Sequence, residues 1–530
     1  MDLFPGGQGE RKLSKMLAKC YSGALNGVDS SAVEIEVYAT KLSSSFAIVG
    51  LPDTAVKEAK DRVSTALKNS GFSSKEEYAV TVNLAPADVK KEGPIYDLPI
   101  AVGLLKATQR LRCEDLHDYA LVGELSLSGE VRRVKGILPI VMEMKRIGRR
   151  AVIVPEANAE EASVVAGIDV IPVATLREAA DFLAGKCVIE PVFNDIASLV
   201  EASRDVGDDF GDVKGQQLVK RAVEVAVAGG HNVLMIGSPG SGKTMIARRI
   251  PSILPPMSAE EALEVSKIHS VAGREKCGGT FVTRRPFRAP HHTVSSIGLL
   301  GGGTHPVPGE VSLAHRGVLF LDEFAEFPRQ ALEVLRQPLE DGHVGVSRAA
   351  AAFDYPSRFM LVAAMNPCPC GYFGDPTHEC RCTQSQILKY QRRVSGPLLD
   401  RIDIQMGVCG VPARDLDALE PGEPSAAIRA RVVAARKVQR ERYRGMKGVL
   451  TNADARSRDL KDVCRLTNEA ADEVRRTMES LGLSARAYDR LLRVSRTIAD
   501  LAGKAEVDQE CIMEAASYRQ LDQTGSQFML

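Results

Sequence analysis

Alternating apolar and polar positions predict strands and helices in turn from Gly23 to about Ala184. Residues 33–38 read Val-Glu-Ile-Glu-Val-Tyr, the period-two pattern of a half-buried strand. A helix is expected over 55–69, with Asp53 as its N-cap and Gly71 after its end. Further expected elements are strands at 78–84, 121–127 and 151–154 and a buried helix at 99–107. This succession predicts a domain of mixed helices and strands.

The pattern changes twice further along the chain. Residues 190–212 hold seven acidic residues and one base, which is typical of a solvated connector. A helix is expected over 217–228 and an apolar strand over 232–236, which begin a second α/β domain. That domain runs to about Ala413, and from there to the end the pattern is almost purely helical, with helices predicted at 426–443, 457–481, 485–502 and 508–521. We therefore predict an N-terminal domain at 1–187, an acidic linker at 188–212, an α/β core at 213–413 and a helical lid at 414–530.

Composition and charge narrow the classes of function. The 530 residues are 44% hydrophobic and 26% charged, which is ordinary for a globular protein of several domains. The 68 basic and 68 acidic residues cancel, which excludes a protein that coats DNA by bulk charge. The start is polar and no apolar run reaches the ~20 residues of a membrane span, so we expect no membrane partner. Eleven sparse cysteines indicate a reducing, cytoplasmic location.

A glycine-rich loop predicts a nucleotide site. The segment Gly-Ser-Pro-Gly-Ser-Gly-Lys-Thr matches G-x-x-x-x-G-K-[ST] and lies between an expected strand and an expected helix. Its backbone N–H groups would surround the phosphates, Lys243 would reach the β- and γ-phosphates, and Thr244 would coordinate Mg²⁺. The residues expected to bind ATP are Gly237, Ser238, Pro239, Gly240, Ser241, Gly242, Lys243 and Thr244.

Two later apolar strands end in residues suited to hydrolysis. The strand before Asp322 and Glu323 would deliver both carboxylates to its C-terminal end. Asp322 would hold the Mg²⁺ shell and Glu323 would polarise the attacking water. The strand at 359–365 ends at Asn366, a side chain that could position water or sense the γ-phosphate.

Two arginines are candidates for stabilising the transition state of ATP hydrolysis. Arg401 follows a short expected helix, which suits a finger that reaches a neighbour's γ-phosphate. Arg486 begins a helix in the C-terminal region and could reach the same phosphate in cis. The alternative for each is an ordinary surface charge.

Four of the eleven cysteines are clustered. Cys368 and Cys370 form one C-x-C pair, and Cys380 and Cys382 form a second after nine intervening residues. Four thiolates at this spacing could bind Zn²⁺ tetrahedrally in an insertion at 368–382. Reduced cysteines in an ordered loop, or a redox pair, are the alternatives.

The order of these motifs resembles that of the AAA+ ATPases. Four segments carry a closer resemblance to the magnesium-chelatase-like branch, namely 209–216, 285–292, 308–317 and 335–342. With the N-terminal domain, the chain resembles the ComM/YifB family over nearly its whole length. The resemblance implies a homo-hexameric ring, and its ComM members are described as ATP-driven DNA branch-migration motors that extend heteroduplex during natural transformation.

The N-terminal domain resembles the Lon-protease fold through segments 92–100 and 123–136. Active domains of that kind need a serine nucleophile and a lysine base. In this chain the two positions fall on Ile95 and Leu138, and Lys135 lies three positions away from the second. The resemblance therefore implies a structural or nucleic-acid-binding domain without peptidase activity.

Basic residues are concentrated in three segments despite the zero net charge. Residues 274–292 and 381–401 each carry a net charge of +4, and 425–447 carries +7. Two segments resemble pore elements of this AAA+ branch: the glycine-rich stretch 297–303 and an expected hairpin at 342–353. The candidate contacts with DNA are Arg348, Arg288 and His292. A solvated helix face at 425–447 and an ordinary hairpin charge at Arg348 are the alternatives.

These features together predict an α/β protein with a Lon-like α+β domain, a P-loop AAA+ core and a helical lid. The predicted function is an ATP-dependent motor on single-stranded or branched DNA, a branch-migration helicase of homologous recombination. A magnesium-chelatase-type metal-insertion motor is the first alternative. An ATP-gated regulator that does not translocate DNA is the second.

Overall fold

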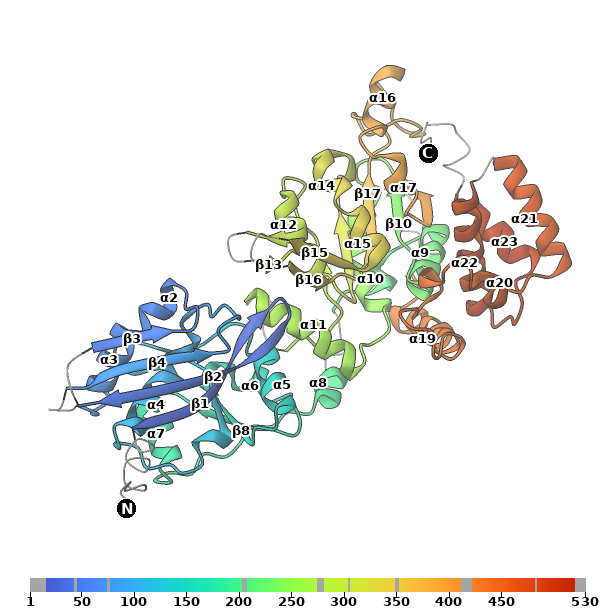
Figure 1. Cartoon of the computed structure of the whole chain (residues 1–530). Coiled ribbons are helices and arrows are strands. Elements are labelled where there is room, and N and C mark those ends of the chain that lie inside the picture. Colours follow the sequence, from blue (N-terminus) through green and yellow to red (C-terminus); the bar gives the residue numbers. More distant parts are fainter. Residues whose placement is uncertain are drawn as a thin grey trace, which may run out of the picture. The chain divides into compact units, whose positions relative to one another are not determined.

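A computed structural model describes the chain in two compact units (Figure 1). The described residues are 16–41, 45–73, 77–202, 207–273, 281–303, 306–347, 352–410, 422–481 and 484–519. Unit 1 comprises Met1–Glu201 and Ala259–Thr283, and unit 2 comprises Ala202–Ser258 and Arg284–Leu530. Among the described residues, no helix has the length and apolar character needed to cross a bilayer.

Unit 1 is built on a seven-stranded mixed sheet with the order β3-β4-β2-β1-β5-β8-β9. The pairs β1/β2 and β2/β4 are antiparallel, and the remaining neighbours are parallel. The strands are β1 (Leu17–Asn26), β2 (Asp29–Thr40), β3 (Ser45–Val49), β4 (Ala79–Ala85), β5 (Tyr119–Leu121), β8 (Ala151–Pro155) and β9 (Asp169–Val173). Strand β2 buries every second side chain, as its period-two sequence predicts.

Four of the helices of unit 1 are α3 (Ala59–Asn69), α4 (Asp97–Ala107), α5 (Ile137–Arg146) and α7 (Leu176–Leu183). The helix expected over 55–69 is divided into α2 (Thr54–Lys57) and α3, and Asp53 caps α2 by accepting from the Val56 N–H at 2.7 Å. The strand expected over 121–127 is also divided, because β5 ends at Leu121 and the short β6 (Glu124–Leu125) forms its own hairpin with β7 (Val131–Arg132).

The segments that resemble Lon proteases belong to the core of unit 1. Ile95 and Leu138 are both buried in its hydrophobic cluster. Asp97 begins α4, where it accepts hydrogen bonds from Arg62 at 2.6 and 2.9 Å. Burial raises the pKa of Asp97 to about 6, although the bond from Arg62 opposes that rise. Apolar packing and one ion pair, between the half-buried Arg62 and the buried Asp97, thus hold the segments that resemble Lon proteases.

An insertion from the middle of the chain completes unit 1. Helix α11 (Ala259–Ala272) lies within the predicted α/β core at 213–413 in the sequence, yet it belongs to unit 1 in space. Leu263 and Phe281 pack against the unit 1 core, and the Ser270 carbonyl accepts from the Gly136 N–H at 3.0 Å. A domain boundary read along the chain misses this arrangement, because the packing partners are more than a hundred residues apart.

Unit 2 contains a five-stranded parallel sheet with the order β11-β14-β17-β10-β18. Its strands are β10 (Val233–Ile236), β11 (Phe287–Arg288), β14 (Val318–Leu321), β17 (Met360–Met365) and β18 (Ile404–Gly407). Strands β10, β14 and β17 are buried at every position, which explains why their sequences are continuous apolar runs. The neighbouring helices include α9 (Gln217–Gly229) and α10 (Lys243–Ile253).

The C-terminal part of unit 2 is helical, as predicted (Figure 1). Its helices are α19 (Ser425–Arg442), α20 (Leu460–Val463), α21 (Asn468–Leu481), α22 (Ala485–Leu501) and α23 (Gln509–Ser517). The single helix expected over 457–481 is wrong. The chain leaves the helical path after Val463 because Leu466 pairs with Val507 in an isolated parallel bridge.

Candidate active site

Sheet topology brings three predicted motifs to one edge. Strand β17 lies between β10 and β14, and all three are parallel. The glycine-rich loop follows β10, Asn366 follows β17, and Asp322 with Glu323 follows β14. Since the carboxyl ends of neighbouring parallel strands meet, these side chains are gathered at the place where α/β proteins bind ligands.

The loop after β10 turns through backbone conformations that favour glycine. Gly240 and Gly242 have φ values of +80° and +90°, a region that favours glycine. The Lys243 ammonium donates to the carbonyls of Gly237 and Ser238 at 2.8 and 2.9 Å. Burial lowers the pKa of Lys243 to about 8, against the opposing charge of Asp322. An anionic phosphate would stabilise the charged amine, so this loop fits the polyphosphate of ATP.

Two oxygen ligands for a magnesium ion lie beside that loop. The Thr244 hydroxyl donates to one Asp322 carboxylate oxygen at 2.7 Å. The other oxygen accepts from the Glu323 N–H at 2.9 Å. A hydroxyl and a carboxylate in direct contact match the hard oxygen ligands that Mg²⁺ prefers, so the pair fits this ion.

Asn366 and Glu323, the residues predicted to place and activate the attacking water, lie beside Lys243 and Asp322. The Lys243 ammonium lies 3.4 Å from the Asn366 side-chain oxygen. Glu323 has a φ of +52°, which is uncommon for a residue with a side chain and is found where a site constrains the backbone. The Glu323 carboxylate lies 2.9 Å from the His292 Nδ1. His292 was expected to contact DNA, and the structure pairs it with the predicted general base.

Replacing His292 with alanine is expected to lower the maximal rate of ATP hydrolysis about tenfold, because the Glu323 carboxylate loses the group that orients it. The affinity for ATP should stay unchanged. His292→Asn, whose amide N–H can replace the ring donor, should recover part of the rate. Steady-state kinetics would measure both constants, with His117→Ala as the control, an exposed histidine of unit 1 beside Asp118. An unchanged rate in His292→Ala would show that Glu323 needs no such support.

Arg401 lies at the opposite edge of the same sheet. Its carbonyl accepts from the Asn232 side chain at 2.9 Å, and Asn232 immediately precedes β10. The glycine-rich loop begins at the other end of that four-residue strand, about 13 Å away at the rise of a β-strand. An arginine side chain is too short to cover that span, so Arg401 cannot reach the glycine-rich loop of its own chain.

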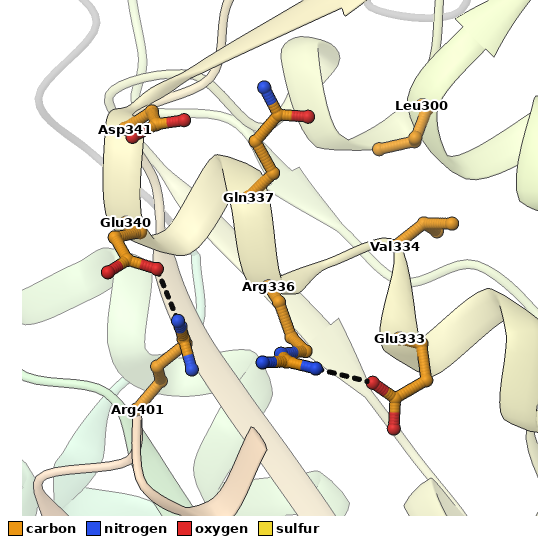
Figure 2. Close-up of a pocket in the computed structure, with 8 residues that line it drawn as sticks. All are labelled: Leu300, Glu333, Val334, Arg336, Gln337, Glu340, Asp341 and Arg401. Atoms are coloured by element: carbon orange, nitrogen blue, oxygen red, sulfur yellow. Dashed lines mark hydrogen bonds and ion pairs between the residues drawn. The ribbon is translucent and has the colours of Figure 1, made fainter. Parts of the chain in front are cut away.

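A pocket surrounds the Arg401 side chain (Figure 2). Arg401 pairs with Glu340, and Arg336 pairs with Glu333 at 3.1 Å in the same pocket. The other lining residues are Leu300, Val334, Gln337 and Asp341. Two guanidinium groups, each held by one carboxylate, form a site where an incoming anion could compete for the arginines.

Arg486 is grouped with Arg401. The hydrogen bond from Arg401 lowers the pKa of Glu340, and the charges of Arg401 and Arg486 lower it further. Arg490, one turn along α22, lies 3.8 Å from Asp403 and holds the helix beside the turn that carries Arg401. The sequence suggests action on the chain's own phosphate, and the charge of Arg486 acts on Glu340, the carboxylate that pairs with Arg401.

The other candidate DNA contacts differ in their surroundings. The Arg288 guanidinium pairs with Glu310 at 2.7 Å. Strands β15 (His343–Ser347) and β16 (Ala352–Pro356) form the expected antiparallel hairpin, but Arg348 at its tip is outside the described residues. In the basic segment 425–447, Arg431 pairs with Glu224 and Glu423, and Arg442 pairs with Asp500. Some of the positive charges of that segment are therefore neutralised by acidic residues of unit 2.

Sequence reasoning assigned no role to two residues that support the glycine-rich loop. The Gln216 side chain donates to the carbonyls of Ser241 and Cys409 at 2.9 and 3.1 Å. The pKa of the Asp375 carboxyl is held low by the hydroxyls of Thr377 and, in the glycine-rich loop, Ser238. Gln216 could have been found from its place in segment 209–216, which resembles the magnesium-chelatase-like branch. No sequence pattern points to Asp375, because Ser238 is more than a hundred residues away along the chain.

The four clustered cysteines do come together. Their sulfur atoms all lie within 4.8 Å of one another, with Cys368 buried and the other three half-buried. His378 lies in the same loop but bonds Thr377 and stacks on Tyr372. The cluster is thus a set of four thiols, which fits a zinc ion.

Comparisons with known proteins cover most of the chain. Residues 209–416 match the profile described as magnesium chelatase, subunit ChlI; residues 33–158 match subunit ChlI of Mg-chelatase, and residues 422–519 match the ChlI C-terminal profile. The chain is 43% identical over 511 residues to the uncharacterized protein YifB of Escherichia coli, covering 96% of this chain and 97% of that protein. It is 43% identical over 506 residues to competence protein ComM of Haemophilus influenzae, covering 95% and 97%.

A weaker likeness concerns unit 1. Lon protease 2 of Bacillus subtilis is 25% identical over 164 residues, which cover 28% of this chain and 29% of that protein. The matches agree with the parallel sheet, the glycine-rich loop and the helical C-terminal region of unit 2 and with the mixed sheet of unit 1. The chain belongs to the family of magnesium-chelatase-like AAA+ proteins that includes YifB and ComM.

Proposed function

We propose that this protein hydrolyses ATP to drive branch migration of DNA, as a homo-hexameric ring in the cytoplasm. The observation that carries the proposal is the separation of Arg401 from Lys243 across the sheet of unit 2. Because Arg401 lies at the other end of the strands from the nucleotide loop, a second copy of the chain has to supply this arginine. In a closed ring every nucleotide site receives Arg401 from a neighbour. The near full-length likeness to a protein named for competence supports a role in natural transformation and recombination.

The chemistry follows from the residues at the sheet edge. Lys243 and the loop N–H groups bind the phosphates, and Thr244 with Asp322 would hold Mg²⁺, which neutralises charge on the phosphate oxygens when bound. Glu323 accepts a proton from the attacking water, and Asn366 helps to place that water. Arg401 of the neighbouring copy stabilises the charge that develops on the γ-phosphate, with Arg486 of that copy nearby.

DNA would pass through the ring along its pore elements. Arg348 follows β15 in the sequence, and the glycine-rich stretch at 297–303 is the second element. Gly301, Gly302 and Gly303 all have φ values near or above +98°, so a side chain there would be strained. Contacts from such elements to the DNA backbone give affinity without strong sequence preference.

The deciding experiment is a branch-migration assay on a synthetic four-way junction. The parent protein with ATP is expected to move the junction, and Lys243→Ala is expected to bind DNA without moving it. Arg348→Ala should weaken DNA binding and reduce the slope of log affinity against log salt by about one. The control is Arg475→Ala, an exposed arginine of α21 that pairs with Asp472.

The result also separates the two alternatives. A metal-insertion motor would hydrolyse ATP with no stimulation by single-stranded or branched DNA. An ATP-gated regulator would bind ATP and DNA but leave the junction in place. The matches to magnesium chelatase profiles favour the first of these over the second.

A further inference from the structure

The segment 366–383 contains four cysteines and lies directly against the nucleotide-binding loop. We propose that Cys368, Cys370, Cys380 and Cys382 bind one structural Zn²⁺, and that this site braces the glycine-rich loop and Asn366 in the geometry that binds ATP. The zinc site rests on the cysteine geometry alone. The bracing role rests on the proposed ATP site.

The distances between the sulfur atoms match one tetrahedral ion. Cys368 Sγ lies 3.4 Å from Cys370 Sγ and 3.7 Å from Cys380 Sγ, and the latter two lie 3.6 Å apart. Zn–S bonds of ~2.3 Å in a tetrahedron place the sulfurs about 3.8 Å apart. A disulfide would need about 2.0 Å, so these thiols are not paired covalently. Four thiolates with no oxygen ligand select Zn²⁺ over Mg²⁺ or Ca²⁺.

A tight turn shapes the first C-x-C pair. The Gly371 N–H donates to the Cys368 carbonyl at 3.0 Å, which closes the turn that follows Cys370. Gly371 has a φ of +89°, a region that favours glycine. The turn therefore brings the sulfurs of Cys368 and Cys370 to one side, where Cys380 meets both.

The same segment touches the nucleotide loop at two points. Gly371 has a φ of +89°, and a Cβ atom there would lie 2.6 Å from the ring of Pro239. The Asp375 carboxylate accepts from the N–H groups of Thr377 and His378, and the hydroxyls of Thr377 and Ser238 both hold its pKa low. Both Ser238 and Pro239 belong to the loop that binds phosphate, so displacement of the cysteine segment displaces that loop.

The third link is along the chain. Cys368 lies two residues after Asn366, whose side-chain oxygen is 3.4 Å from the Lys243 ammonium. The Gln391 side chain donates to the intervening Pro367 carbonyl at 2.9 Å. Because only Pro367 separates Asn366 from Cys368, a metal ion bound to Cys368 also limits the movement of Asn366.

The metal half is tested on the purified full chain. Elemental analysis should find one zinc per chain and no iron, and an organomercurial should release it in a colorimetric zinc assay. Replacement by Co²⁺ should produce the intense sulfur-to-cobalt charge-transfer bands of a tetrahedral thiolate site. Cys380→Ser and Cys382→Ser should lose the ion, while Cys409→Ser, an exposed cysteine outside the cluster, should keep it. A parent protein without zinc, and without cobalt bands after reconstitution, would overturn the site.

The bracing half uses variants that keep the four cysteines. Gly371→Ala and Asp375→Ala should retain one zinc per chain and the parent's far-ultraviolet circular dichroism, yet bind a fluorescent ATP analogue roughly ten- to a hundredfold more weakly. Asp472→Ala, an exposed carboxylate of α21, is the control. Unchanged nucleotide affinity in both variants would overturn the brace. A parent that carries zinc but binds no ATP would instead refute the proposed ATP site, and with it the brace, while the zinc site would stand.

Discussion

Arg401→Ala is expected to lower ATP turnover by about 10³-fold, because the charge on the γ-phosphate loses its arginine in the transition state. ATP binding to the variant should change little, since the Lys243 site lies at the other edge of the sheet. Arg401→Lys should also be poor, because a single ammonium cannot reproduce the planar fork of the guanidinium. Steady-state hydrolysis and equilibrium ATP binding would measure the two effects separately.

A mixing experiment shows which copy supplies the arginine. Arg401→Ala and Lys243→Ala chains, each inactive alone, should recover part of the parent rate when they assemble together. In such a ring the Arg401→Ala chain offers an intact Lys243 to a neighbour that still has Arg401. Arg456→Ala is the control, as an exposed arginine that pairs with Asp459. Failure to recover activity in assembled mixed rings would contradict the shared site.

Glu323→Gln is expected to bind ATP as tightly as the parent and to hydrolyse it about 10²- to 10³-fold more slowly, because an amide cannot accept the proton of the attacking water. The variant keeps the shape of the side chain and the N–H bond to Asp322. Single-turnover hydrolysis alongside nucleotide binding would separate a chemical defect from a binding defect.

The matched control for Glu323 is Glu326→Gln. Glu326 follows in the same short turn but pairs with Arg393, away from the Thr244–Asp322 contact. Its substitution should leave turnover close to the parent value. If Glu323→Gln hydrolysed ATP at the parent rate, another group would have to act as the base.

The buried strands were predictable because each is a continuous apolar run that ends in polar residues. The runs before Gly237, Asp322 and Asn366 correspond to β10, β14 and β17. The break after Val463 was not predictable, because it depends on the pairing of Leu466 with Val507. The place of α11 was hidden for the same reason, since its partners lie in a distant part of the chain.

The sequence by itself determined the nucleotide chemistry, because the glycine-rich loop and the acidic strand end are local patterns whose spacing is imposed by phosphate geometry. It also determined that Ile95 and Leu138 could not act as nucleophile and base, since neither side chain has a reactive group. Only the tertiary structure decided which residues face one another. It paired His292 with Glu323, grouped Arg486 with Arg401, and set the cysteine cluster against Ser238 and Pro239. Contacts of this kind depend on the order and direction of strands in a sheet, which no local pattern encodes.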